Sequence, residues 1–203
     1  MALLACEGMA SPLAGPFDLT LAAGEAIAIS GPSGAGKSLF LRMLADLDPN
    51  QGGVWLNGVA RSAIPAPEWR RRVAYLPADS GWWRPDIAGH FAPGQRAEAA
   101  ALAARLLLDA ALLEAPVARL STGERSRLAL IRALLGAPAV LLADEPTGAL
   151  DPAATAAVEA LLGERREAGL GLILVSHDPA QGDRLGARRR RIVARRFAAE
   201  EAP

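Results

Sequence analysis

Short, uninterrupted runs of apolar residues recur along this chain and predict the buried strands of an α/β fold. The clearest runs are AIAIS (26–30), VLLAD (140–144) and LILVS (172–176). Continuous apolar runs of this length are typical of parallel strands that are covered on both faces. Two further segments, GGVWLNG (52–58) and RRVAYLP (71–77), read as an exposed strand with a turn and as another strand. The pattern therefore predicts a mostly parallel sheet.

Helical segments lie between these strands. The sequence SLFLRMLADL (38–47) reads as the helix that follows the first strand. The segment 152–169 lies between the last two apolar runs and is the expected crossover helix. It opens at Asp151 and Pro152 and closes near Gly169, which are residue types that favour helix starts and ends. Strand, helix and strand in this order predict a βαβ unit.

The middle of the chain has a different character, because residues 95–113 are helix formers with little β-branching. We therefore expect one domain over residues 1–203. Its core would comprise about 1–78 and 138–203, and a helical subdomain of about 79–137 would be inserted into it. The predicted fold class is α/β, with a mostly parallel sheet, an antiparallel β edge and this inserted subdomain.

The tryptophans fall outside the strongest core runs. The simplest interpretation is that they pack the junction with the helical subdomain. Trp82 and Trp83 are adjacent, so both cannot point inward on regular structure, which favours an exposed contact surface. The four residues are Trp55, Trp69, Trp82 and Trp83.

Composition limits the class of protein. The chain has 203 residues, of which 51% are apolar, and this is enough for one domain with a sizeable core. Its 22 basic and 22 acidic residues balance, so no electrostatic footprint for nucleic acid is present. A single cysteine, Cys6, excludes an internal disulfide and fits a reducing compartment. We expect neither a signal peptide nor a membrane span, because the start lacks a basic region and no apolar stretch approaches about 20 residues.

The segment GPSGAGKS (31–38) matches the phosphate-binding pattern G-x-x-x-x-G-K-[ST] completely. Glycines in this loop allow backbone N–H groups to approach phosphates without Cβ atoms in the way. Lys37 is expected to reach the β- and γ-phosphates, and the Ser38 hydroxyl is expected to ligate Mg²⁺. The predicted strand before the loop and the helix after it support the match. The expected nucleotide-binding residues are Gly31, Pro32, Ser33, Gly34, Ala35, Gly36, Lys37, Ser38 and Leu39.

Two carboxylates end the apolar strand at residues 139–146, AVLLADEP. Asp144 is expected to hold Mg²⁺, and Glu145 to polarise the attacking water as general base. Alone, the pair could be a strand-end turn, but we place its strand beside the one that carries the phosphate loop. His177 follows the last apolar strand, where α/β sites gather, and its imidazole would bond the γ-phosphate or the attacking water.

The segment LSTGERSRLALIRALL (120–135) distinguishes between nucleotide-binding families. It resembles the signature of the ATP-binding cassette family, LSGGQ followed by a basic helical run. Ser121 and Gly123 keep their places, whereas Thr122 and Glu124 depart from the pattern. Ser121 would cap a helix whose N-terminus presents N–H groups to a phosphate. GALD (148–151), ending in Asp151, resembles the D-loop of the same family.

The resemblance covers nearly the whole chain, and its motifs occur in the family's order. It implies a P-loop NTPase core in which two cassettes dimerise head to tail. Each ATP would then lie between the phosphate loop of one chain and Ser121, Thr122, Gly123, Glu124 and Asp151 of the other. ATP would close a homodimer or pseudo-dimer, and hydrolysis would open it. The implied partner is an integral membrane permease, and the implied location is the cytoplasmic face of the membrane.

The chain also departs from the family in ways that bear on function. The family's usual glutamine after the strand at 71–77 is replaced by Ala78, which cannot ligate Mg²⁺, although Asp79 is a candidate substitute. An aromatic residue usually stacks on adenine, but none occurs near residues 8–10, and Phe17 lies too close to the first apolar strand. Thr122 replaces a glycine, which matters if that position needs a positive φ.

Three other functions are compatible with the family resemblance. A soluble regulatory ATPase without a permease remains open because of Ala78. DNA-repair ATPases of the same superfamily carry long coiled coils between the phosphate loop and the signature, and no heptads occur here. Ribosome-associated members resemble two fused cassettes, whereas this chain holds one. The favoured prediction is an ATPase subunit of a transporter that uses ATP and Mg²⁺.

Overall fold

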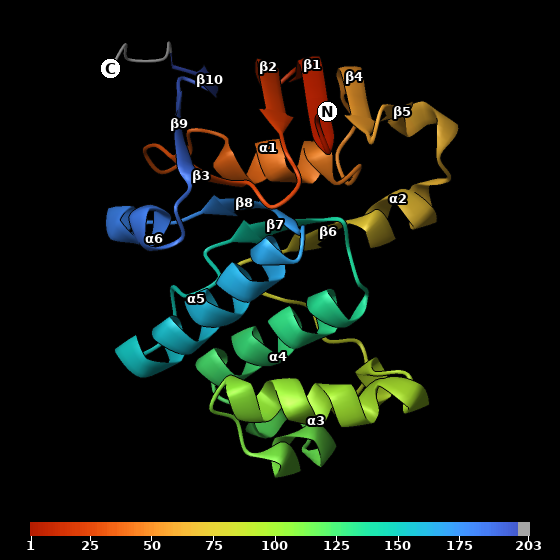
Figure 1. Cartoon of the computed structure of the whole chain (residues 1–203), viewed down its shortest axis with the longest axis vertical. Helices are drawn as coiled ribbons and strands as arrows, with labels where there is room; N and C mark the ends of the chain where they lie inside the picture. Colours follow the sequence, from red (N-terminus) through yellow and green to blue (C-terminus); the bar gives the residue numbers. More distant parts are fainter. Residues whose placement is uncertain (199–203) are drawn as a thin grey trace.

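The computed structural model describes residues 1–198, so the last five residues of the expected core lie outside it. Two sheets and a set of helices are stacked in layers (Figure 1). The strands are β1 (Leu4–Ser11), β2 (Ala14–Leu21), β3 (Ala26–Ser30), β4 (Gln51–Leu56), β5 (Val59–Ala60), β6 (Val73–Leu76), β7 (Val140–Asp144), β8 (Gly171–Val175), β9 (Arg188–Val193) and β10 (Arg196–Phe197). The α-helices are α1 (Lys37–Leu44), α2 (Ala66–Arg72), α3 (Arg96–Arg105), α4 (Thr122–Leu135), α5 (Pro152–Glu167) and α6 (Pro179–Arg184).

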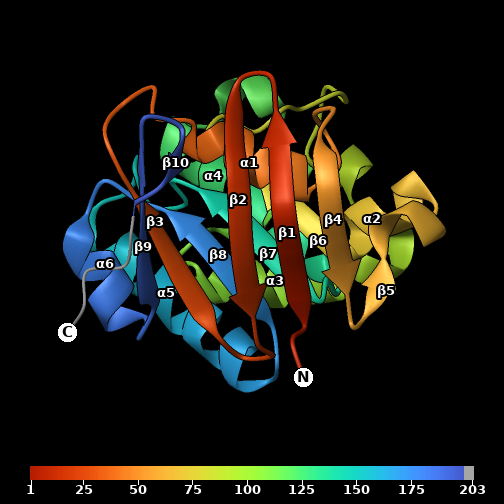
Figure 2. The same ribbon diagram turned by 90° about the horizontal axis from the view of Figure 1, so that it is seen from above.

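The larger sheet has the strand order β10-β9-β3-β8-β7-β6, and all its strands except β10 pair in parallel. This confirms the α/β class and the mostly parallel sheet. The smaller sheet, β2-β1-β4-β5, is antiparallel and lies above α1 (Figure 2). One expectation is wrong: β3 and β7 are not neighbours, because β8 pairs with both and lies between them.

Alternation along the buried strands divides the core into two layers. Successive side chains of a strand point to opposite faces of the sheet. In β7, Val140 and Leu142 face α1 and the antiparallel sheet, whereas Leu141 and Ala143 face α4 and α5. All five residues of β7 are buried, as the continuous apolar run predicts. Both faces of the central strands β7 and β8 are therefore covered, whereas β9 at the side of the sheet is mostly exposed.

Two helices end earlier than the sequence predicts. Helix α1 ends at Leu44, whose carbonyl oxygen accepts a hydrogen bond from the Trp69 indole (2.9 Å). Helix α3 ends at Arg105, and Leu107 then adopts a positive φ of 56°. Asp109 explains the break, because its carboxylate caps a short 3₁₀ turn by accepting from the Ala111 N–H (2.8 Å).

The tryptophans occupy different environments. Trp69 is fully buried in the core cluster that contains α1 and the antiparallel sheet, so the interpretation that it packs the junction with the helical subdomain is wrong. Trp82 is partly buried against the helical layer, whereas Trp83 is 69% exposed. The two adjacent tryptophans therefore lie in different environments, one partly buried and one exposed, as the sequence predicts. Strand β4, expected to be exposed, also alternates: its Val54 and Leu56 are buried.

Helices α3 and α4 lie together on the side of the larger sheet opposite the antiparallel sheet (Figure 1). The proposed boundaries of a helical subdomain, at about 79 and 137, stay a prediction. No helix within residues 1–198 combines the length and apolar character that a membrane span requires.

Candidate active site

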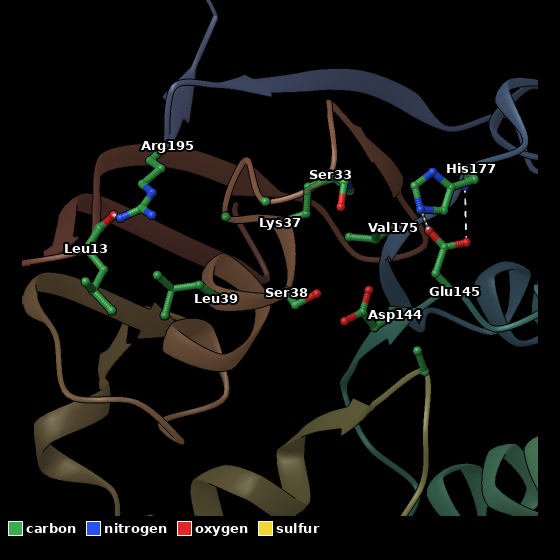
Figure 3. Close-up of a pocket in the computed structure, with 13 residues that line it drawn as sticks. Leu13, Ser33, Lys37, Ser38, Leu39, Asp144, Glu145, Val175, His177 and Arg195 are labelled. Atoms are coloured by element: carbon green, nitrogen blue, oxygen red, sulfur yellow. Dashed lines mark hydrogen bonds and ion pairs between the residues drawn. The ribbon is translucent and has the colours of Figure 1, made fainter.

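A pocket opens where the parallel strands end. The carboxyl ends of parallel strands meet at one edge of a sheet, which is where α/β proteins place ligands. The phosphate loop after β3, the end of β7 and the segment after β8 all contribute to it (Figure 3). The expected site residues that line this pocket are Ser33, Gly34, Gly36, Lys37, Ser38, Leu39, Asp144, Glu145 and His177.

The phosphate loop holds its lysine in the pocket wall. Lys37 is only 8% exposed, and its Nζ atom donates to the carbonyl oxygens of Gly31 (2.8 Å) and Pro32 (3.1 Å). Gly36 has a φ of 97° and begins α1, so a left-handed residue turns the loop into the helix. The helix N-terminus then contributes N–H groups and a positive dipole end to the pocket. This arrangement suits a bound phosphate chain.

Three of the expected phosphate-loop residues support the loop and do not line the pocket. A Cβ atom at position 31 would lie 2.1 Å from the Ile192 carbonyl oxygen, so Gly31 is required by the close approach of β9. Ala35 is buried in the core, and Pro32 contributes its carbonyl to Lys37. These three residues do not line the pocket.

Asp144 and Ser38 face each other across the pocket floor (Figure 3). Asp144 is 6% exposed, and within residues 1–198 its side chain receives one hydrogen bond, from the Tyr75 hydroxyl (3.2 Å). Burial and the neighbouring Asp144 carboxylate raise the pKa of Tyr75, so this hydroxyl stays a donor. A buried carboxylate that forms no ion pair with the described residues, together with a facing hydroxyl, is a donor set that fits Mg²⁺.

Side chains alone do not complete a metal site. In the described part of the chain, no group of three or more His, Cys, Asp or Glu residues could hold a metal ion. Mg²⁺ commonly takes one or two protein ligands and completes its shell with water and substrate phosphates. The pair Ser38 and Asp144 fits that mode, in which the ion would neutralise phosphate charge.

Glu145 and His177 form the other wall of the pocket. The Glu145 carboxylate accepts from the His177 backbone N–H through Oε2 (3.1 Å). Its Oε1 atom is buried and has no hydrogen-bond partner among the described residues, although His177 Nε2 lies 3.3 Å away. The His177 imidazole itself is largely exposed. A buried acceptor without a donor is suited to a water molecule.

The backbone at Glu145 aims its side chain. Glu145 has a φ of 52°, which is uncommon for a residue with a Cβ and is found where a site demands it. This turn takes the chain out of β7 so that the carboxylate faces His177 at the end of the neighbouring strand. Burial raises the pKa of the Glu145 carboxyl, against the opposing effect of the His177 N–H. A raised pKa makes the carboxylate a stronger base.

The buried side chain of Gln181 connects the segment after β7 with the segment after β8, and no sequence pattern predicts this role. Gln181 in α6 is fully buried and donates to Thr147 Oγ1 (2.8 Å) and to Glu159 Oε1 (3.1 Å). Thr147 lies in the turn after Glu145, and α6 follows His177. The bridge therefore fixes the turn after β7 against the helix after β8.

The expected signature residues lie elsewhere. Ser121 caps α4, accepting from the Glu124 N–H (3.3 Å), and Glu124 accepts in return from the Ser121 N–H (2.8 Å). Thr122 is the first residue of α4 and has no positive φ, so threonine is accommodated. None of the residues Ser121, Thr122, Gly123, Glu124 and Asp151 lines the pocket. One chain therefore does not bring the signature and the phosphate loop together.

The signature instead packs beside the D-loop of its own chain. A Cβ atom at Gly123 would lie 3.1 Å from the Ala149 carbonyl oxygen and 3.3 Å from the Leu150 side chain. Asp151 caps α5 by accepting from the Ala154 N–H (2.9 Å). The N-termini of α4 and α5 therefore lie close together, and their first residues are exposed.

Four further residues line the pocket. Ala78 stands at the position that the resemblance assigns to the family's glutamine, whereas Asp79, the candidate substitute, does not line the pocket. Leu13 and Arg195 come from opposite ends of the chain, and Val175 ends β8. No local pattern marks Arg195, because it is one of several arginines near the end of the sequence. Phe17 is fully buried against Phe40 and Phe197 and is unavailable to a ligand.

Comparison with known proteins gives a consistent result. The sequence profile of the family described as "ABC transporter" matches residues 15–148. The macrolide export ATP-binding/permease protein MacB of Nitrosomonas europaea is 39% identical over 178 residues, which cover 80% of this chain and 27% of that protein. The lipoprotein-releasing system ATP-binding protein LolD of Anaeromyxobacter dehalogenans is 37% identical over 191 residues, covering 86% of this chain and 80% of that protein.

A solved structure shows the same fold. It is the dimeric structure of an ATP-binding cassette in a post-hydrolysis state, bound to ADP and Pi. The TM-score is 0.85 at 21% identity, and the alignment covers 98% of this chain and 97% of that one. The chain spans about half the length of several other curated relatives that it matches.

Proposed function

The chain belongs to the ABC transporter family, and on that premise we propose that it hydrolyses ATP to drive a membrane permease carried on another chain. The proposal rests on one observation, which is that the same pocket is lined by Lys37, Asp144, Glu145 and His177. These groups come from three adjacent strands of one sheet. They supply a cation for phosphates, a metal ligand and a base for water.

The side chains have separable roles in this proposal. Lys37 binds the terminal phosphates, and Ser38 with Asp144 would hold Mg²⁺, which neutralises phosphate charge when bound. Glu145 accepts a proton from the attacking water, for which its Oε1 is suited because it accepts no hydrogen bond from the described residues. His177, with an exposed imidazole beside Glu145, would donate to the γ-phosphate. The water oxygen bonds to the γ-phosphorus while the bridging P–O bond to the β-phosphate breaks, so that ADP leaves and inorganic phosphate forms, with the water proton passing to Glu145.

A second copy of the chain would complete the site. The pocket contains the phosphate loop but none of the signature residues, so a head-to-tail dimer can place Ser121 of one copy over the phosphate of the other. Such an arrangement gives two equivalent sites related by a two-fold axis. We propose that ATP closes this dimer and that product release opens it. The same proposal places the chain on the cytoplasmic face of the membrane, bound to the permease.

The proposed permease contact is the loop 79–91. Trp82 and Trp83 lie in it, and the Arg132 guanidinium of α4 stands 4.5 Å and 4.7 Å from their ring centroids. Arg132 also donates twice to the Gly81 carbonyl (3.1 Å). His90 makes edge contacts with both tryptophan rings. The loop is therefore held firmly while Trp83 projects into solvent, and exposed aromatics beside arginine dominate many binding surfaces.

Replacement of Trp83 by alanine should release the permease without unfolding the chain. Because Trp83 is 69% exposed, we expect little change in melting temperature and in basal ATPase activity. The membrane protein that co-purifies with the tagged chain should be lost. Val59→Ala, at another exposed apolar residue, is the matched control and should retain it.

Trp82→Ala provides the contrast, because that ring packs against the helical layer and its loss should lower stability. If Trp83→Ala alone lowers the melting temperature cooperatively, Trp83 belongs to the core and the docking proposal fails. If the wild-type chain purifies with no membrane protein, the regulatory alternative suggested by Ala78 is favoured instead.

A further inference from the structure

The pocket has a second end that the phosphate chemistry does not use. Lys37, Ser38 and the Glu145 wall define one end, and Leu13 with Arg195 lies at the other, beyond Leu39 (Figure 3). A nucleoside triphosphate is an elongated molecule with phosphates at one end and a flat base at the other. The pocket has matching ends, one polar and one formed by leucines and a guanidinium.

Two turns build this end. Leu13 lies in the turn between β1 and β2, and Arg195 lies in the two-residue turn between β9 and β10. The turns are joined by two hydrogen bonds: the Gly15 N–H donates to the Arg195 carbonyl (2.8 Å), and Arg195 Nη1 donates to the Leu13 carbonyl (3.1 Å). The arginine is therefore held at both its backbone and its guanidinium.

The same arginine lies beside the phosphate loop. A Cβ atom at Gly36 would be 3.8 Å from Arg195 Cγ, which is ordinary contact distance. The aliphatic part of Arg195 thus passes along the loop, and its guanidinium reaches toward Leu13. This places the guanidinium at the end of the pocket away from Glu145 and His177.

The backbone at Arg195 is in a conformation that favours glycine. Ala194 and Arg195 have φ values of 49° and 65°, as the tightest hairpin turns require. Asparagine and glycine are the residues that adopt such turns without strain. An arginine at this position, held by two hydrogen bonds and lining the pocket, is consistent with a role for its side chain in the site.

A guanidinium and leucines suit the face of a nucleobase. Arginine stacks on aromatic rings through its planar cation, and the interaction strengthens where water is displaced. Leu13 is 59% exposed, which leaves an apolar surface beside the guanidinium. Among residues 1–198, none of those that line this pocket is aromatic. A base entering here would contact Arg195 and Leu13 rather than a tyrosine or phenylalanine.

We propose that Arg195 and Leu13 form the base-binding platform of the nucleotide site, with the guanidinium against the face of the adenine ring. This inference rests on the proposed ATPase function and names the residues that hold the base. In this proposal, the turn between β1 and β2 and the turn between β9 and β10, which are far apart in the sequence, contact the same base.

The test compares a ligand that has a base with one that lacks it. Arg195→Gly removes the side chain at a position whose φ favours glycine, so the fold should be retained or stabilised. Isothermal titration should show that the Kd of Mg-ATP rises about tenfold. The Kd of magnesium tripolyphosphate, which has no base, should change less than about twofold. Leu13→Ala should act in the same direction with a smaller effect.

Arg195→Lys separates charge from shape, because lysine keeps the cation but loses the planar face. We expect it to weaken ATP binding while leaving tripolyphosphate binding unchanged. Equal weakening of both ligands by Arg195→Gly would assign Arg195 to the phosphates and overturn the proposal, as would unchanged ATP affinity. A wild-type chain that binds neither ligand would refute the ATPase proposal itself, which is a distinguishable result.

Discussion

Replacement of Lys37 by alanine should reduce ATP hydrolysis below about a tenth of the wild-type rate. The Nζ atom is already held in the pocket wall by the carbonyls of Gly31 and Pro32, so little rearrangement is needed when phosphate binds. Loss of a charge-assisted contact to a sequestered phosphate weakens binding by a few kcal/mol, on the order of 2–3. Phosphate release from Mg-ATP by the purified variant measures the effect.

The matched control for this variant is Arg42→Ala. Arg42 lies in the last turn of the same helix, α1, and its exposed side chain pairs with Asp48. Its loss removes one positive charge without touching the pocket, so activity should stay near wild type. Retention of more than about a tenth of the activity by Lys37→Ala, with a melting temperature near that of the wild type, would contradict the role of Lys37.

Replacement of Glu145 by glutamine should separate binding from hydrolysis. The amide has nearly the same shape and can still accept from the His177 N–H, but it cannot take a proton from water. We expect ATP affinity near that of the wild type and a fall in hydrolysis of about a hundredfold or more. Single-turnover phosphate release and equilibrium binding give the two quantities separately.

The same variant should trap the dimer, because ATP that binds without being cleaved keeps the two copies closed. Sizing chromatography with ATP and Mg²⁺ should show the mass of two chains, and without nucleotide the mass of one. Glu164→Gln, an identical change at an exposed residue of α5, is the control and should hydrolyse normally. A Glu145→Gln chain that stays monomeric at high concentration would argue against ATP-driven closure of isolated chains.

The parts of the fold that the sequence predicts are those in which local pattern and tertiary environment agree. Strands β3, β7 and β8 are buried on both faces, so their apolar runs are unbroken and easily recognised. The crossover helix α5 carries its own cap in Asp151. The phosphate loop and the pair Asp144 and Glu145 follow from residue type and position after a strand.

The features of the fold and the site that the sequence does not predict depend on contacts between distant segments. Strand β9 is largely arginine and mostly exposed, so it carries no apolar pattern and exists because β3 offers a parallel partner. The order of strands, with β8 between β3 and β7, is set by packing rather than by sequence order. Arg195 reaches the pocket only because β9 and β10 turn back beside the phosphate loop. The burial of Trp69 likewise depends on the end of α1.

We propose that a complete site needs the phosphate loop of one copy and the signature of another. Two variants that fail for different reasons test it directly. Lys37→Ala disables the phosphate loop, and Ser121→Asp retains a helix-capping side chain while placing a negative charge at the signature. Each variant alone should be nearly inactive, because both sites of its dimer carry the defect.

Mixing the two variants in equal amounts, without nucleotide and before adding Mg-ATP, should restore hydrolysis. Random association makes about half of the dimers mixed, and each mixed dimer has one intact site of two, so about a quarter of wild-type activity is expected. Phosphate release at that level would establish that the site is shared between copies. A mixture no more active than the sum of its separate components would contradict the account.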